Sequence, residues 1–143
     1  MTQLQKEQAW AKSSQWVAVV DDDAQIAQAL ELLLSLKGVR ASAHASAESL
    51  LSCLTVQQGR WLLQTADGET GALAAAVLDL NLPGMTGVDL SLHLREVQPD
   101  LKVVMITAAL NDVLEQRGDD LKGVTCLSKP FDLESLEKAL FGD

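Results

Sequence analysis

Residues 16–23 read Trp-Val-Ala-Val-Val-Asp-Asp-Asp, an apolar run that ends in three consecutive aspartates. Residues 75–80 repeat the arrangement as Ala-Ala-Val-Leu-Asp-Leu, with Asp79 near the end of the apolar run. Short runs without polar alternation are typical of strands covered on both faces, as in a parallel sheet between layers of helices. The two segments therefore predict an α/β fold built on parallel strands.

The aspartates that end these strands are expected to meet in space. Ligands of open parallel sheets bind outside the carboxyl ends of the strands, which is where Asp21, Asp22 and Asp79 lie. Two carboxylates ~4 Å apart repel by about 4 kcal/mol at an effective dielectric constant of ~20. A hard divalent cation relieves this repulsion, and a ligand set made only of oxygens suits Mg²⁺ or Mn²⁺. The sequence thus predicts a metal-assisted site at this edge of the sheet.

The composition is that of one acidic domain. Apolar residues make up 48% of the 143 residues, enough for a sizeable core, but aromatic residues only 3%, so Leu, Val, Ala and Ile must fill it. A net charge of −9 argues against a nucleic-acid or anionic-membrane partner. Cys53 and Cys126 lack paired spacing and read as reduced core thiols. With no membrane-spanning run and no signal-peptide core, we expect a cytoplasmic protein.

Strand and helix patterns alternate along residues 16–143, after a polar arm at residues 1–15. The expected strands are residues 16–20, 39–45, 75–80, 101–106 and 124–127. The expected helices are residues 24–37, 46–54, 87–97 and 132–141, with a polar segment at 111–122 broken by Gly118. This alternation implies right-handed crossovers and a five-stranded, doubly wound parallel sheet.

Residues 57–74 fit the alternation least well. Gly59, Asp67-Gly68 and Gly71 interrupt this stretch, whereas Trp61-Leu62-Leu63 requires burial. We expect the helix that starts at Ser46 to extend into it, followed by a loop that carries Trp61.

Four segments match one protein family in its order and at compatible intervals. They are Val-Val-Asp-Asp-Asp at 19–23, Leu-Asp-Leu-Asn-Leu-Pro-Gly-Met-Thr-Gly at 78–87, Ile-Thr-Ala at 106–108 and Lys-Pro-Phe at 129–131. Through them, residues 16–141 resemble the receiver domain of bacterial two-component response regulators, a flavodoxin-like fold. The resemblance implies a phosphoacceptor domain that takes a phosphoryl group from a histidine kinase or phosphotransfer protein.

The resemblance also assigns roles to the acids. Asp79 matches the phosphoacceptor, and Asp21 and Asp22 match the pair that holds Mg²⁺. Asp79 completes this metal site together with Asn81, which is expected to contribute its backbone carbonyl. The partners implied are the phosphoryl donor and a downstream protein target or output domain, with no direct contact to nucleic acid or membrane.

Two further residues match the groups that bind the phosphoryl oxygens. Thr107 matches the hydroxyl that moves onto the phosphoryl group, and Lys129 matches the lysine that pairs with it, before a proline usually joined in cis. Physical chemistry agrees, because a transferred phosphoryl group spreads its charge over three oxygens. A cation, the Lys129 ammonium and the Thr107 hydroxyl can each take one of them, leaving Asp79 to attack as a nucleophile.

The chain departs from the family pattern in three places. The position three residues before Lys129 is usually aromatic, and here it is Cys126, so gating by a ring is expected to be absent or altered. Gly118 interrupts the helix expected near residues 111–122 and costs ~1 kcal/mol relative to alanine, which predicts a short or mobile helix. The interval from Asp22 to Asp79 is also longer than usual.

Some polar residues have simpler interpretations. Asp23 can cap a helix instead of joining the acidic set. His44 and His93 lie off the predicted acidic edge, on a strand edge and a helix face, so we expect surface or packing roles for both.

Two alternative functions are compatible with the sequence alone. An unphosphorylated receiver fold can serve as a scaffold that binds a partner protein. Cys126 and Gly118, which depart from the family pattern, favour this alternative. A phosphohydrolase with an aspartyl nucleophile is less compatible, because such enzymes usually carry an acid two residues after the nucleophile, and here that residue is Asn81. We therefore expect no enzymatic activity beyond the domain's own aspartyl phosphorylation and dephosphorylation. Whether the output lies in a longer chain or in a separate protein is left open.

Overall fold

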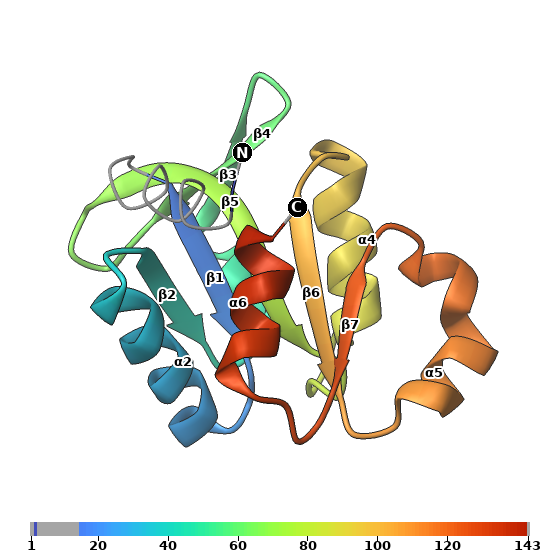
Figure 1. The fold of residues 1–143 in the computed structure, drawn as a ribbon. Helices are drawn as coiled ribbons and strands as arrows, with labels where there is room; N and C mark the ends of the chain where they lie inside the picture. Colours follow the sequence, from blue (N-terminus) through green and yellow to red (C-terminus); the bar gives the residue numbers. More distant parts are fainter. Residues whose placement is uncertain (1, 3–14, 143) are drawn as a thin grey trace.

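The computed structural model describes residue 2 and residues 15–142. The five predicted parallel strands are present, but within the described residues they form part of a seven-stranded sheet whose other two strands are antiparallel. Strand β1 pairs in parallel with β2 and β5, β5 pairs with β6, and β6 pairs with β7 (Figure 1). Their bounds are Trp16–Val20 (β1), Arg40–His44 (β2), Thr70–Asp79 (β5), Lys102–Thr107 (β6) and Thr125–Ser128 (β7). The predicted arm at residues 1–15 lies outside the described residues except for Thr2 and Gln15.

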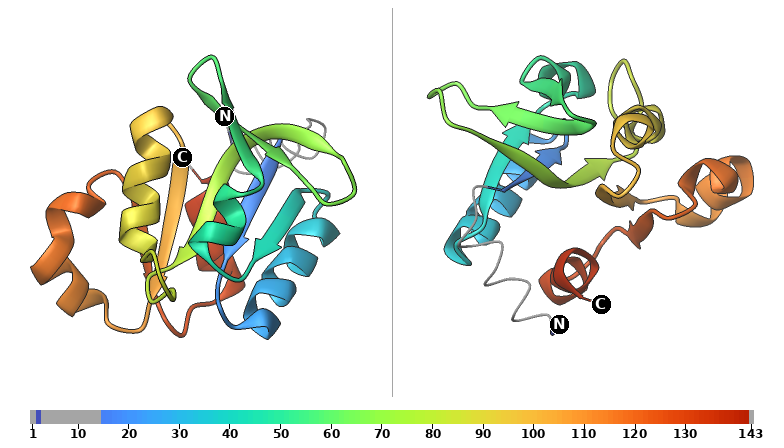
Figure 2. Two further views of the ribbon diagram at one scale, coloured as in Figure 1. Left: turned by 180° about the vertical axis from the view of Figure 1, so that it is seen from behind. Right: turned by 90° about the horizontal axis from the view of Figure 1, so that it is seen from above.

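Helices cover both faces of the sheet, as a doubly wound fold requires (Figures 1 and 2). Helices α2 and α6 cover one face, and α3, α4, α5 and the 3₁₀ turn η1 lie on the other. Their bounds are Ala24–Leu36 (α2), Ala47–Leu51 (α3), Gly87–Val97 (α4), Leu110–Arg117 (α5), Gly118–Leu121 (η1) and Leu133–Phe141 (α6). No helix of the described residues combines the length and apolar character that a membrane crossing requires.

Strand β1 shows why the predicted strands lack polar alternation. Val17 and Val19 pack against the core under α2 and α6, whereas Ala18 and Val20 pack against the core under α3 and α4. Successive side chains of a strand point to opposite faces, so a strand between two helical layers needs apolar residues at every position. The sequence interpretation of β1 as a strand buried on both faces is therefore correct.

The helix starts also follow sequence signals. The Asp23 carboxylate accepts hydrogen bonds from the backbone N–H groups of Gln25 and Ile26, so this acid caps α2. Ser46, Thr86 and Asp132 cap α3, α4 and α6 in the same way. Helix α5 begins at Leu110 without a side-chain cap and ends at Arg117, directly before Gly118, so it is short, as the glycine predicts.

The expected extension of the helix after Ser46 is wrong. Helix α3 ends at Leu51, and the chain then forms an antiparallel hairpin of β3 (Leu54–Gln57) and β4 (Arg60–Gln64). Gln58 and Gly59 make its two-residue turn with φ angles of 53° and 74°, a geometry that suits the twist of a hairpin. Strand β5 pairs with β4 and begins earlier than expected, at Thr70.

A period of two was the signal for this hairpin. Trp61 and Leu63 are buried, whereas Arg60 and Gln64 are exposed, which is the alternation of a strand with one covered face. The apolar run Trp61-Leu62-Leu63 conceals this alternation when it is read as a block.

Trp61 fixes the hairpin to the end of α4. Its ring Nε1 donates to the Leu94 carbonyl at 2.8 Å, and its backbone N–H donates to Gln98 Oε1 at 2.9 Å. The buried Gln98 amide in turn donates to the Leu73 carbonyl at 3.3 Å, and the His93 ring lies 5.7 Å from the Trp61 ring. The hairpin thus completes the layer formed by α3 and α4, and His93 has the packing role that the sequence predicts.

Replacing Trp61 by alanine should lower the free energy of unfolding by about 3 kcal/mol, because it leaves a cavity and removes the hydrogen bond from the ring to the Leu94 carbonyl. The measurement is urea unfolding followed by far-ultraviolet circular dichroism. Val56→Ala is the matched control on the same hairpin, since Val56 is 47% exposed, and it should change stability by less than ~0.5 kcal/mol. Equal effects of the two substitutions would contradict this account of the hairpin.

Candidate functional site

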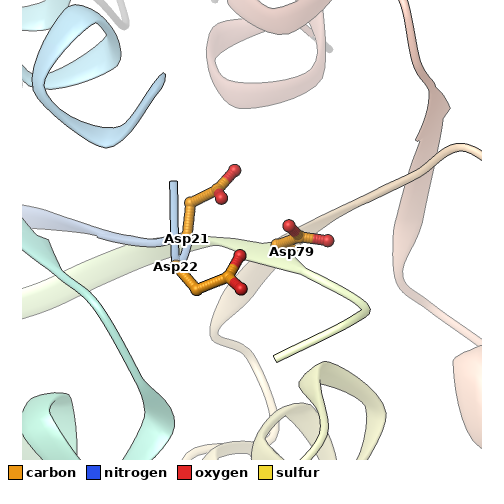
Figure 3. A group of neighbouring side chains, drawn as sticks. All are labelled: Asp21, Asp22 and Asp79. Atoms are coloured by element: carbon orange, nitrogen blue, oxygen red, sulfur yellow. The ribbon is translucent and has the colours of Figure 1, made fainter. Parts of the chain in front are cut away.

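Three aspartates meet at the carboxyl ends of β1 and β5, as the sequence predicts. Val20 pairs with Leu78, so the next residues, Asp21 and Asp79, lie side by side. Asp21, Asp22 and Asp79 each offer one carboxylate oxygen, and these oxygens all lie within 4.8 Å of one another (Figure 3). Such a set of hard oxygen donors can hold a divalent cation.

Burial makes this cluster costly to keep charged. Asp21 and Asp79 are 2% and 6% exposed, whereas Asp22 is open to solvent. Burial raises the pKa of Asp21, and the nearby Asp79 carboxylate raises it further. The backbone N–H of Asp23, which donates to Asp21 Oδ1 at 2.9 Å, opposes this shift. A bound cation would relieve both effects.

Lys129 supplies a positive charge from the end of β7. Its Nζ lies 3.2 Å from Asp79 Oδ2 and 3.8 Å from Asp21 Oδ2, with 27% of the side chain exposed. The backbone N–H of Lys129 donates to the Thr107 carbonyl at 2.8 Å, which holds the end of β7 beside β6. The bond from Lys129 to Pro130 is cis. The structure thus brings the predicted lysine to the predicted aspartate.

Thr107 and Asn81 lie at the same edge of the sheet. Thr107 is the last residue of β6, is 1% exposed, and its hydroxyl oxygen accepts from the Ala109 N–H at 3.0 Å. Asn81 follows β5 and is exposed, and its N–H donates to Asp79 Oδ1 at 3.1 Å. One Asp79 oxygen therefore faces Asn81 and the other faces Lys129.

The expectation that His44 lies off the acidic edge is wrong, because His44 ends β2 beside Val20, next to Asp21. The His44 carbonyl accepts from the Asp21 N–H at 3.0 Å, and the His44 ring lies 2.8 Å from Ser42 Oγ. Burial lowers the pKa of His44, which favours the neutral ring in a packing role. Cys126 is half-buried on β7, and burial raises the pKa of its thiol, so it is protonated at neutral pH.

Gly87 holds the backbone of Asp79, a role that its place at a helix start does not reveal. A Cβ atom on Gly87 would collide with the Asp79 carbonyl oxygen and would lie 2.9 Å from Leu80 Cα. The Gly87 N–H donates to the Leu80 carbonyl at 3.0 Å, so the start of α4 is drawn against the end of β5. Only glycine permits so close an approach.

Gly87→Ala should push the end of β5 away from α4 and displace the Asp79 carboxylate. We expect a loss of about 1–3 kcal/mol in the free energy of unfolding and weaker binding of divalent cations. Urea unfolding and a Mg²⁺ titration measure the two effects. Gly118→Ala is the matched control, because Gly118 has ordinary helical angles and open space where a Cβ atom would lie, so neither quantity should fall.

Asp21→Asn should stabilise the protein in the absence of divalent cations by about 1 kcal/mol at neutral pH, because it removes a buried charge. Since the folded-state pKa of Asp21 is raised, the contribution of Asp21 to wild-type stability is greatest below the ordinary aspartate pKa and is lost as pH rises through the folded-state pKa. The variant should lack this component in urea unfolding with EDTA between about pH 4 and pH 7.

Asp132→Asn provides a control of opposite sign for this measurement. Hydrogen bonds from Ser135 lower the pKa of Asp132, so its contribution is present above the unfolded-state pKa and is lost as pH falls through the folded-state pKa. Identical pH profiles for wild type and Asp21→Asn would contradict the proposed cost of keeping the buried Asp21 carboxylate charged.

Comparison with known proteins places the chain in a family. The family model of the response regulator receiver domain matches residues 17–141. The chain is 30% identical over 130 residues to the probable transcriptional regulatory protein TcrX of Mycobacterium tuberculosis, covering 84% of this chain and 45% of TcrX. It is 26% identical to the transcriptional regulatory protein FixJ of Rhizobium meliloti, covering 86% of this chain and 55% of FixJ. The chain thus spans about half the length of these relatives.

Solved structures share the fold. A sensor protein from Polaromonas sp. JS666 superposes with a TM-score of 0.68 at 28% identity, covering 87% of this chain and 91% of that one. The chemotaxis protein CheY4 of Vibrio cholerae superposes with a TM-score of 0.66 at 23% identity, covering 87% of this chain and 94% of that one. Because the family model spans nearly all of the described sheet and helices, the chain belongs to the response regulator receiver domain family.

Proposed function

We propose that Asp79 accepts a phosphoryl group from a phosphohistidine on a kinase or phosphotransfer protein, in a reaction that requires Mg²⁺. The observation that carries this proposal is the position of the Asp79 carboxylate between two acids and an ammonium. Its ligand oxygen lies within 4.8 Å of those of Asp21 and Asp22, and Lys129 Nζ lies 3.2 Å from Oδ2. This arrangement holds a nucleophile where the charge of a phosphoryl group can be neutralised.

The donor set fits Mg²⁺. Three carboxylates and one ammonium leave the site with an excess of negative charge, and the buried position of Asp21 makes that excess unfavourable. Asp21, Asp22, Asp79 and the backbone carbonyl of Asn81 would hold the ion. When bound, it would neutralise the carboxylates and polarise the phosphoryl oxygens.

The protein's own groups perform the transfer. An Asp79 carboxylate oxygen attacks phosphorus in line, the P–N bond to the donor histidine breaks, and the electron pair leaves with the imidazole nitrogen. The Lys129 ammonium moves from the carboxylate to a phosphoryl oxygen. The Thr107 hydroxyl accepts from Ala109 N–H and keeps its own hydrogen to donate to another phosphoryl oxygen. Hydrolysis of the acyl phosphate restores Asp79, so the domain catalyses only its own phosphorylation and dephosphorylation.

The new phosphoryl group would act as a switch through these same donors. If Thr107 and Lys129 move toward the phosphoryl group, the ends of β6 and β7 move with them, and these strands lead into α5 and α6. This would change the surface that a downstream target or output domain contacts. Cys126 lies half-buried on β7, so the change would proceed without an aromatic ring at this position.

A second candidate function is that of an unphosphorylated scaffold that binds a partner protein. Two features favour it, the half-buried Cys126 and the short helix α5. In that case the affinity for a partner protein should be the same with Asp79→Asn or after removal of Mg²⁺. A phosphorylation-dependent change in affinity would exclude it.

Incubation with Mg²⁺ and acetyl phosphate should add one phosphoryl group to the wild-type protein, detected by intact-protein mass spectrometry. Asp79→Asn should abolish the adduct, because an amide oxygen is a poor nucleophile, and EDTA should abolish it in the wild type. Asp67→Asn, an exposed acid in a turn, is the matched control and should be phosphorylated normally. A wild-type protein that binds Mg²⁺ but never forms the adduct would refute the proposal.

A further inference from the structure

The loop from residue 80 to residue 86, which carries Asn81, makes a polar contact with helix α3 and also borders an open cavity. Glu48 Oε2 of α3 accepts from the Met85 N–H at 3.1 Å. The cavity has a volume of about 500 Å³ and is lined by loop residues together with residues of α4 and α5. It is bounded by residues that include Asp22, Asn81, Leu82, Val88, Val113 and Arg117.

The Glu48 carboxylate lies against the loop with both oxygens. A Cβ atom on Gly84 would lie 2.9 Å from Glu48 Oε2 and 3.3 Å from Oε1. Gly84 has φ of +73°, a left-handed conformation that glycine adopts without strain. The loop thus turns at the point where the carboxylate meets it, and the absence of a side chain at Gly84 allows the contact.

Glu48 belongs to helix α3, which is anchored in the core. Its neighbours Ala47 and Leu50 are fully buried, and the Ser46 hydroxyl caps the helix by accepting from the Ser49 N–H at 3.1 Å. A hydrogen bond from an N–H to a carboxylate is roughly twice as strong as one between neutral groups. The carboxylate therefore fixes the loop relative to a short but anchored helix.

The cavity gives the loop space into which it could move. Leu82, Val88 and Val113 line this cavity, although all three side chains are largely buried in the core under α3, α4 and α5. If the Glu48 contact were lost, the loop could relax toward this space and carry Asn81 with it. Asn81 follows Asp79 by two residues and donates to its carboxylate, so such a movement would reach the acidic site.

We propose that Glu48 is a positioning residue for the divalent-cation site, acting through the Met85 N–H on the loop that carries Asn81. The inference rests on the proposed function of that site. Glu48 meets the loop at the Met85 N–H and beside Gly84, and it is not one of the acids whose oxygens cluster in the described part of the chain. Its removal should therefore change Mg²⁺ affinity more than it changes the folding of the domain.

Mg²⁺ titration of three variants tests the proposal. Glu48→Ala should weaken Mg²⁺ binding by about 10-fold, the size typical of an outer contact that orients a metal site. Glu48→Gln should stay within roughly threefold of wild type, because its amide oxygen can still accept from Met85 N–H. Glu134→Ala is the matched control, since Glu134 is likewise an exposed first-turn acid, of helix α6, and it should leave Mg²⁺ affinity unchanged.

Phosphorylation kinetics separate positioning from a structural defect. With acetyl phosphate, Glu48→Ala should need about 10-fold more Mg²⁺ for half-maximal rate but should reach the wild-type rate at saturating Mg²⁺. Unchanged Mg²⁺ affinity in Glu48→Ala, or equal losses in Glu48→Ala and Glu134→Ala, would overturn the proposal while leaving the proposed function intact. A wild-type protein that binds no Mg²⁺ would overturn both.

Discussion

Repulsion between the carboxylates at the ends of β1 and β5 is the constraint around which this domain is organised. The pairing of Val20 with Leu78 forces Asp21 and Asp79 together, although a pair of carboxylates ~4 Å apart repels by about 4 kcal/mol. Burial of one large apolar side chain contributes about 1.5–3 kcal/mol, and every residue of β1 is buried. A few core residues therefore outweigh the repulsion, and Lys129 offsets part of it. Packing of the core thus keeps the carboxylates close together, as the proposed phosphoryl transfer requires.

Helix α4 links this site to the rest of its layer. At its first residue, Gly87 lies against the Asp79 carbonyl, and at its far end the helix and Gln98 hold the β3–β4 hairpin through Trp61. Helix α5 is attached differently, with Val113 as its buried residue and exposed ion pairs from Arg117 to Asp89 and Asp120. Exposed pairs contribute at most ~1 kcal/mol each, so α5 is less firmly held than α4. The site of the proposed switch therefore lies next to a firmly packed helix, α4, and a less firmly packed one, α5.

The sequence predicted the five parallel strands and most helix starts, because period, length and capping residues are local signals. It failed at residues 57–74, where the Trp61-Leu62-Leu63 run hid an alternation of buried and exposed positions. The error has a tertiary cause, since Trp61 is buried by Leu94 and Gln98, more than thirty residues further along the chain. The local alternation at residues 60–64 is too short to identify a hairpin without these distant contacts.

For the site, the sequence by itself determined which groups gather at the carboxyl ends of the strands: acids at the ends of β1 and β5, a hydroxyl at the end of β6 and an ammonium at the end of β7. Parallel strands end at one edge, so residue type and strand order suffice for that prediction. Only the tertiary structure decided how the groups are held. The Gly87 contact and the bond from Met85 to Glu48, 37 residues apart, depend on how closely two segments approach, and that distance is set by packing of the whole domain.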